Sequence, residues 1–272
     1  MLAHLVAGRL RPSGGEASTL AGMGDHEDAH RIATEAGELL LGIRAEAAAG
    51  RLDPSQLKDE GDRRSNELIL ERLRQTHPDD AVLSEERADD PRRINAARTW
   101  IVDPLDGTRE FGEDPRTDWA VHVALVEKGF PTVAAVALPA RGMTLSTLDP
   151  PKLPPPVDRA PVLVVSRTRP PAETELVRAA LGGDLLPMGS AGAKTMAIVL
   201  GDADVYVHGG GQWEWDSAAP VGVAAAAGLH VSRLDGSPLV YNQVPPYLPD
   251  LVICRPELAE SVLSAVASAS AG

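Results

Sequence analysis

The 272-residue sequence is poor in cysteine and in long apolar runs, and each shortage excludes a class of protein. Its one cysteine, Cys254, cannot form an internal disulfide, which indicates a reducing compartment. No apolar run approaches the roughly 20 residues of a membrane span, and the N-terminus has no signal-peptide pattern. The net charge of −13 argues against nucleic acid as a partner. We therefore expect a cytoplasmic globular protein with neither a membrane nor a nucleic-acid partner.

Changes in composition divide the chain, of which 43% is apolar and can build a packed core. Residues 1–24, rich in Gly, Ser and Ala, are predicted to be a flexible extension. Residues 25–150 are predicted to form an N-terminal α+β half. A proline-rich surface loop over 151–161 then leads to a C-terminal α/β half over 162–272.

Apolar periodicity predicts the elements of the first half. Helices are expected over 25–49 and 63–75, and Asp62 has the position of an N-cap for the second. Short strands are expected over 81–83, just before Glu85 and Glu86, and over 100–102. A hairpin with a slightly long turn and a further strand complete this half, over 119–126, 132–138 and 143–148.

The second half alternates strands and helices. Strands are predicted over 162–165, 203–207 and 251–254, and helices over 171–181, 193–200, 217–227 and 257–265. Asp216 directly precedes one of these helices, so an N-cap is its simplest role.

One zinc-like motif occurs near the N-terminus, where His26-Glu-x-x-His30 opens the first predicted helix. A zinc site needs both histidines on one buried face and a third ligand. We interpret the motif as the solvated, charged first turn of a surface helix and reject zinc.

The stretch over residues 100–111 is the strongest candidate site. An apolar run ends in Asp103 and Asp106, three residues apart around Pro104, and Gly107 and Thr108 follow. Proline biases Asp103 toward an extended conformation and ends the strand there. Two carboxylates beside a glycine turn suit a divalent cation, and free backbone N–H groups suit a phosphate.

Three separated motifs resemble the inositol monophosphatase family of lithium-sensitive, magnesium-dependent phosphatases. They are Glu85-Glu86, the stretch over 100–108, and Trp215-Asp216-Ser-Ala-Ala, in that order, and the resemblance covers residues 25–270. The stretches over 100–111 and 211–216 look like the actinobacterial CysQ branch, which acts on 3′-phosphoadenosine 5′-phosphate in sulfur assimilation. The resemblance implies a layered α-β-α-β-α sandwich of the inositol monophosphatase/fructose-1,6-bisphosphatase type.

The resemblance also implies roles for individual residues. Two or three Mg²⁺ ions, with Mn²⁺ as an alternative, would be held by Glu85, Asp103, the Leu105 carbonyl, Asp106 and Asp216. Asp62 and Thr108 would polarise the attacking water, with Glu85 nearby. Phosphate and substrate contacts would come from Asp106, Gly107, Thr108, Ser166, Arg167, Arg169 and Lys194. For the last three cations, a solvated surface charge is an equally good interpretation.

The favoured function is removal of the 3′-phosphate of 3′-phosphoadenosine 5′-phosphate to give AMP, with the sulfated nucleotide as a further candidate substrate. Alternatives are an inositol-1-phosphate or a fructose-1,6-bisphosphate phosphatase. A catalytically dead phosphate-binding protein would lack a metal acid or a dyad member, whereas this sequence has them all. The expected partner is a small phosphorylated substrate, and a homodimer is compatible with the resemblance.

Overall fold

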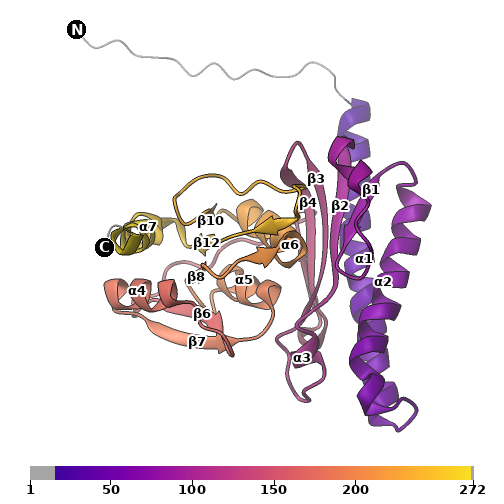
Figure 1. The fold of residues 1–272 in the computed structure, drawn as a ribbon, viewed down its shortest axis with the longest axis horizontal. Coiled ribbons are helices and arrows are strands. Elements are labelled where there is room, and N and C mark those ends of the chain that lie inside the picture. Colours follow the sequence, from indigo (N-terminus) through magenta and orange to yellow (C-terminus); the bar gives the residue numbers. More distant parts are fainter. Residues whose placement is uncertain (1–15, 271–272) are drawn as a thin grey trace.

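The computed structural model describes residues 16–270 of the chain, and its helices and sheets alternate in layers (Figure 1). The helices are α1 (Glu16–Ala48), α2 (Leu57–Thr76), α3 (Thr108–Phe111), α4 (Ala172–Leu181), α5 (Ala191–Leu200), α6 (Glu214–Ala227) and α7 (Ala259–Ser270). Short 3₁₀ turns are η1 (Pro54–Gln56), η2 (Pro91–Asn95), η3 (Pro139–Arg141) and η4 (Pro256–Leu258). No helix among these described residues is long and apolar enough to cross a bilayer.

Two five-stranded sheets form the β layers. The first has the order β1-β2-β3-β4-β5, made of β1 (Ala81–Ser84), β2 (Arg98–Asp106), β3 (Ala120–Glu127), β4 (Phe130–Leu138) and β5 (Met143–Ser146). The second has the order β10-β12-β8-β6-β7, made of β6 (Val162–Ser166), β7 (Asp184–Met188), β8 (Val205–His208), β10 (His230–Ser232) and β12 (Leu251–Cys254). A small ribbon pairs β9 (Gln212–Trp213) with β11 (Tyr247–Leu248).

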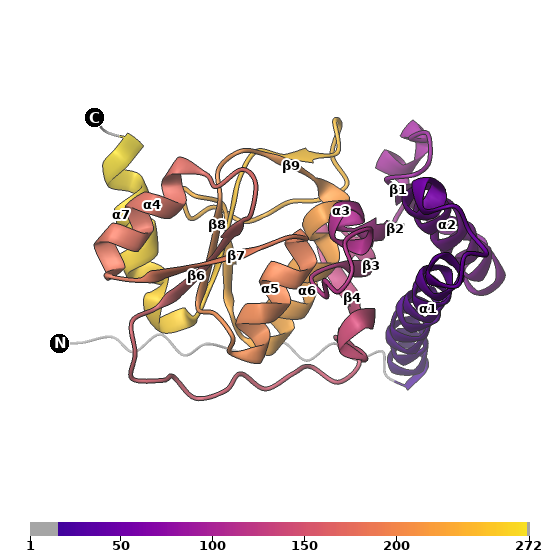
Figure 2. The ribbon, with the colours of Figure 1, turned by 90° about the horizontal axis from the view of Figure 1, so that it is seen from below.

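Helices α1 and α2 cover the outer face of the first sheet, α5 and α6 lie between the two sheets, and α4 and α7 cover the second sheet from outside (Figures 1 and 2). This arrangement confirms the predicted α-β-α-β-α sandwich. Strand β3 is apolar at nearly every position because both faces of this sheet are buried. Its Val121, Val123 and Leu125 pack toward α1, whereas Ala120 and Ala124 belong to the core between the sheets.

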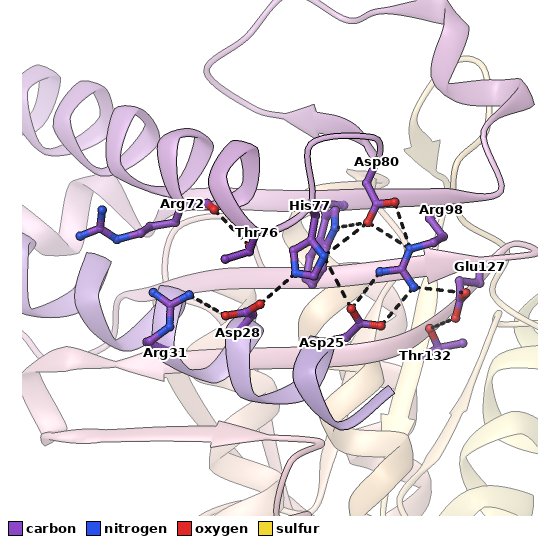
Figure 3. A network of polar contacts seen from close by, with 11 residues as sticks. Asp25, Asp28, Arg31, Arg72, Thr76, His77, Asp80, Arg98, Glu127 and Thr132 are labelled. Atoms are coloured by element: carbon purple, nitrogen blue, oxygen red, sulfur yellow. Dashed lines mark hydrogen bonds and ion pairs between the residues drawn. The ribbon is translucent and has the colours of Figure 1, made fainter. Parts of the chain in front are cut away.

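A polar network ties α1 to the end of α2 and to β2 (Figure 3). The Arg98 guanidinium donates to Asp25 at 2.9 and 3.0 Å and to Asp80 at 3.0 Å. The His77 ring packs on Trp100 at 4.8 Å and lies 3.2 Å from an Asp28 oxygen. The acids around His26 are therefore structural ties between elements.

Several predicted helix boundaries are wrong. Helix α1 begins at Glu16 instead of residue 25, and residues 1–15 of the predicted extension lie outside the described part. Helix α2 begins at Leu57, so Asp62 lies inside the helix and is not its N-cap. Helix α6 begins at Glu214, so Asp216 occupies its first turn, where its carboxylate accepts from the Trp213 N–H at 2.8 Å. Leu57, in the first turn of α2, packs against the core of the first half, and such tertiary contacts override weak local propensities.

The turns and small strands also differ from expectation. The β3–β4 turn is the short pair Lys128-Gly129, both at positive φ (53° and 84°), instead of a slightly long turn. The predicted strands omitted β7, β9, β10 and β11. Two of them have only two residues, too few for a periodic pattern.

Candidate active site

The carboxyl ends of β1 and β2 bring the first acids together. These strands are parallel, with Ser84 beside Val102, so the next residues, Glu85 and Asp103, emerge at the same edge of the sheet. The Glu85 N–H also reaches the Val102 carbonyl at 3.4 Å. Acids at the carboxyl end of such strands lie where ligand sites of α/β folds form.

An irregularity in β2 brings Asp106 next to Asp103. The prediction that the strand ends at Asp103 is wrong, because β2 continues to Asp106 and its pairing with β3 shifts register between these two residues. Pro104 has no N–H for the ladder, which is why the shift occurs there. As a result Asp103, Asp106 and the facing His122 each offer a ligand atom within 4.8 Å of the others.

A close approach of α2 positions Asp62. A Cβ on Gly61 would lie 2.8 Å from the Phe111 ring and 3.0 Å from Leu105, so only glycine lets α2 pack this tightly. The carboxylate of Asp62 then lies 3.4 Å from the Thr108 hydroxyl, which is also 3.1 Å from the Leu105 carbonyl. The predicted pair Asp62–Thr108 is therefore in contact.

Asp106 is held by residues from distant parts of the chain. Its carboxylate accepts from the Ser190 hydroxyl at 2.5 Å and from the Gly192 N–H at 2.7 Å, at the start of α5. The Nε2 atom of His122 lies 3.2 Å from the same oxygen. Gly192 is required here, since a Cβ would meet His122 Nε2 at 2.0 Å.

His122 and Ser190 were not predicted as site residues. The one sequence signal for His122 is that it interrupts an otherwise apolar strand. The sequence gives no such signal for Ser190, which is a small polar residue between Gly189 and Ala191. Its φ of +49° and its hydrogen bond to the Ala193 N–H identify it as a specialised cap of α5.

The buried acids destabilise one another's charges. Burial first, and then the charge of Asp106, raises the pKa of Glu85 and of Asp216 to about 7. Burial and the charge of Glu85 raise the pKa of Asp103 well above its usual range. Burial would also raise the pKa of Asp106, but His122, Ser190 and Gly192 lower it to about 2.

These residues fit a divalent cation. Several carboxylates lie together in one buried, desolvated region. Their mutual repulsion keeps some of them protonated until a cation neutralises the charge of the group. Carboxylate and carbonyl oxygens are the ligands that Mg²⁺ prefers in proteins. The set of Glu85, Asp103, Asp106 and Asp216 has that chemistry, with His122 as an imidazole beside Asp106.

A cavity of about 370 Å³ opens beside Asp106 and Asp216. Its wall carries Ser166, Arg169 and Lys194 of the predicted substrate contacts. Lys194 is buried, and its Nζ donates to the Ser190 carbonyl at 2.8 Å. Burial lowers the pKa of Lys194. This cavity extends from the acids to a rim that carries positive charge.

Arg167 lies apart from Arg169 and Lys194, the other two cations predicted to contact substrate. Its guanidinium donates to Glu110 at 2.7 Å and to Glu113 at 2.8 Å, and it is not among the residues that line the cavity. Arg169 is exposed and lines the cavity rim. The geometry therefore favours Arg169 over Arg167 as a contact for substrate.

Gly107 and Thr108 start the turn after the acids. Gly107 has a φ of +87°, and a Cβ there would lie 3.1 Å from Ser190 and 3.2 Å from the Asp118 carbonyl. The helix that follows, α3, has only four residues. Its dipole is accordingly small, so local N–H groups are the relevant donors.

The histidines of the zinc-like motif have other partners. His26 Nδ1 is hydrogen-bonded to the Thr147 hydroxyl at 2.7 Å, and His30 Nδ1 to the Ser146 hydroxyl at 3.0 Å. Both rings are half-buried against the end of β5, and α1 begins at Glu16. The interpretation of a solvated first turn is therefore wrong.

The chain is similar to known proteins over most of its length. A model of the inositol monophosphatase family matches residues 26–271. The 3′-phosphoadenosine 5′-phosphate phosphatase of Mycobacterium leprae is 52% identical over 247 residues, covering 86% of this chain and 90% of that protein. The 3′(2′),5′-bisphosphate nucleotidase CysQ of Escherichia coli is 33% identical over 188 residues, covering 64% and 75%. The crystal structure of CysQ from Bacteroides thetaiotaomicron superposes with a TM-score of 0.74 at 27% identity, covering 87% and 98%.

Proposed function

This chain belongs to the inositol monophosphatase family, and from that premise we propose that it is a Mg²⁺-dependent phosphatase that removes the 3′-phosphate of 3′-phosphoadenosine 5′-phosphate to give AMP. The observation that carries the proposal is the buried cluster of Asp103, Asp106 and His122. The charges of Glu85 and Asp216 act on Asp103, and the charge of Asp62, in contact with Thr108, acts on Glu85. Sulfur assimilation and a cytoplasmic location stay predictions from the resemblance and the composition.

Glu85, Asp103, Asp106, Asp216 and the Leu105 carbonyl would hold the Mg²⁺ ions. When bound, these ions lower the pKa of a water and neutralise charge on the phosphate and the leaving oxygen. The residues of the chain then have to orient the water and the substrate. Because burial and the nearby Glu86 raise the pKa of Asp62 to about 7, its carboxylate can accept a proton near neutral pH.

Thr108 connects Asp62 to the attacking water. A hydroxyl donates one hydrogen and accepts others, so Thr108 can donate to Asp62 while it accepts from the water. The N–H groups of Gly107 and Thr108 would bind the phosphate oxygens. Lys194 and Arg169, farther along the cavity wall, would bind the second phosphate as charge-assisted donors.

A phosphate-release panel tests the proposal. The protein is assayed with 3′-phosphoadenosine 5′-phosphate, inositol 1-phosphate and fructose 1,6-bisphosphate, each with Mg²⁺ or with EDTA. We expect the highest kcat/KM on the nucleotide and loss of all activity in EDTA. Higher kcat/KM on another member of the panel would overturn the substrate assignment, and full activity in EDTA would overturn the metal.

The matched variant is Asp106→Asn, which keeps the shape of the side chain and its contacts with Ser190 and Gly192 but removes the charge. We expect it to stay folded by circular dichroism and to lose Mg²⁺-dependent turnover. Wild-type protein that binds Mg²⁺ but hydrolyses none of the three substrates would instead support a catalytically dead phosphate-binding protein.

A further inference from the structure

Glu214 is a buried acid beside the site that the mechanism above does not use. It is the first residue of α6, two positions before Asp216, and it is 0% exposed. The cavity is lined by Asp216 and not by Glu214. Removing a carboxylate from water costs free energy unless hydrogen bonds replace those to water, so its partners explain why it is tolerated here.

Both oxygens of the Glu214 carboxylate accept hydrogen bonds from one loop. The backbone N–H of Asn242 donates to one oxygen and that of Gln243 to the other, each at 2.7 Å. The Glu214 N–H in turn donates to the Pro246 carbonyl at 3.0 Å. Three hydrogen bonds therefore fasten the loop over residues 241–246 to the first turn of α6.

Arg93 fastens the same loop to the first half of the chain. Its buried guanidinium donates to the side-chain oxygen of Asn242 at 2.7 Å and to the Gln243 carbonyl at 2.8 Å. The side-chain amide of Asn242 also donates to the Arg93 carbonyl at 3.1 Å. Arg93 belongs to η2, which leads into β2. The loop thus links the start of α6 to the segment before β2, the strand that carries the first two metal acids.

We propose that Glu214 positions Asp216 for metal binding by fixing the first turn of α6 to the 241–246 loop, an inference that rests on the proposed Mg²⁺ site. Asp216 lies in the same helical turn and is the metal acid that the second half contributes. Mg²⁺ demands near-ideal octahedral geometry, so acids from two halves of a chain must be held at matching separations. Residues that orient metal ligands commonly change metal affinity by about 10- to 100-fold. Glu214 itself contacts neither metal nor substrate in this role.

The test removes one of the two hydrogen bonds of the carboxylate. Glu214→Gln keeps the shape of the side chain, but its amide nitrogen replaces an oxygen and faces a backbone N–H, so that two donors meet. Isothermal titration of Mg²⁺ into the metal-free protein, without substrate, measures the affinity directly. We expect this variant to bind Mg²⁺ roughly tenfold more weakly than wild type.

Asp204→Asn is the matched control. The Asp204 carboxylate also accepts from a backbone N–H, that of Val162 at 2.8 Å. This contact is at the opposite end of β6 from Ser166, which lines the cavity. We expect the control to lower Tm and to keep the wild-type Kd for Mg²⁺. An equal loss of Mg²⁺ affinity in Asp204→Asn and Glu214→Gln would overturn the inference, because destabilisation alone would then account for both.

Asn242→Gly tests the other side of the loop. Asn242 has a φ of +62°, which glycine adopts readily, so its backbone N–H can still donate to Glu214. The variant removes the two hydrogen bonds between the Asn242 side chain and Arg93. We expect Mg²⁺ affinity to fall in the same direction as in Glu214→Gln, and by less.

The two proposals fail in different ways. Wild-type protein that binds no Mg²⁺ and needs none for turnover would contradict the proposed function. Wild-type protein that binds Mg²⁺ no more tightly than Glu214→Gln would contradict only the role of Glu214. Thermal melting identifies a variant that fails to fold. If Glu214→Gln is that variant, an unchanged Kd for Mg²⁺ in Asn242→Gly overturns the inference instead.

Discussion

Removing the charge of Asp216 should stabilise the metal-free protein while it abolishes catalysis. Burial and the charge of Asp106 raise the pKa of Asp216 from 3.8 to about 7. The folded state therefore binds this proton more tightly than the unfolded state does. The stability that the protonated Asp216 carboxyl contributes is complete below pH 3.8 and is lost as the pH rises to about 7.

The magnitude follows from the size of that change. Each step of one in pKa corresponds to about 1.4 kcal/mol, so a rise of about three gives an upper limit of about 4 kcal/mol. Asp216 is partly exposed, and the neighbouring Glu85 can bind a proton in its place, so the effect is smaller than this limit. We expect Asp216→Asn to raise the free energy of unfolding at pH 8 by about 1–3 kcal/mol in EDTA. At about pH 3 the two proteins should be nearly equal, because the Asp216 carboxyl is then mostly protonated in both the folded and the unfolded state.

Urea denaturation, followed by the fluorescence of the four tryptophans, measures this difference. Mg²⁺ at about 100 times its Kd should stabilise the wild type by about 2.7 kcal/mol at pH 8 and stabilise Asp216→Asn much less. The control is Asp250→Asn, since the Asp250 carboxylate pairs with Arg233 and its loss should destabilise the protein. The reasoning is refuted if Asp216→Asn is no more stable than wild type at pH 8 in EDTA, or if Mg²⁺ stabilises both equally.

Three further predictions concern the positioning of the catalytic pair and the second phosphate. Gly61→Ala should cost about 1–3 kcal/mol of stability and lower turnover, because its Cβ would press on Phe111 and separate Asp62 from Thr108. Gly42→Ala in α1, where a Cβ meets nothing within 4 Å, should instead stabilise the protein slightly in the same denaturation assay. Thr108→Ala should lower kcat by roughly 10²–10⁴-fold in phosphate release and Thr108→Ser by far less, and equal losses would argue against a role for the hydroxyl. Arg169→Ala should raise KM for the nucleotide bisphosphate roughly tenfold, with a smaller effect on inositol 1-phosphate. Arg167→Ala should lower Tm, because it leaves the buried Glu110 without this partner, and it should keep the ratio between the two substrates.

The local features of the site could be read from the sequence because they depend on neighbours along the chain. Asp103, Pro104, Asp106 and Gly107 lie within one short stretch, and the proline and glycine restrict the backbone whatever surrounds them. Apolar periodicity likewise located most helices and strands, whereas their layered arrangement came from the resemblance to the family. The proposed roles of Asp62, Glu85 and Asp216, by contrast, came from the resemblance to the family, because these residues lie far from that stretch in the sequence.

The tertiary structure decided which distant groups meet. His122 faces Asp103 because β3 pairs with β2 in one register, and Ser190 reaches Asp106 because α5 begins beside the first sheet. Neither contact leaves a pattern in the linear sequence, because strand register and helix packing depend on the whole core. The same reason separates Arg167, which pairs with Glu110, from Arg169 at the cavity. Sequence by itself thus determined the kind of chemistry, and the packing of the two halves decided which residues hold the acids and face the substrate.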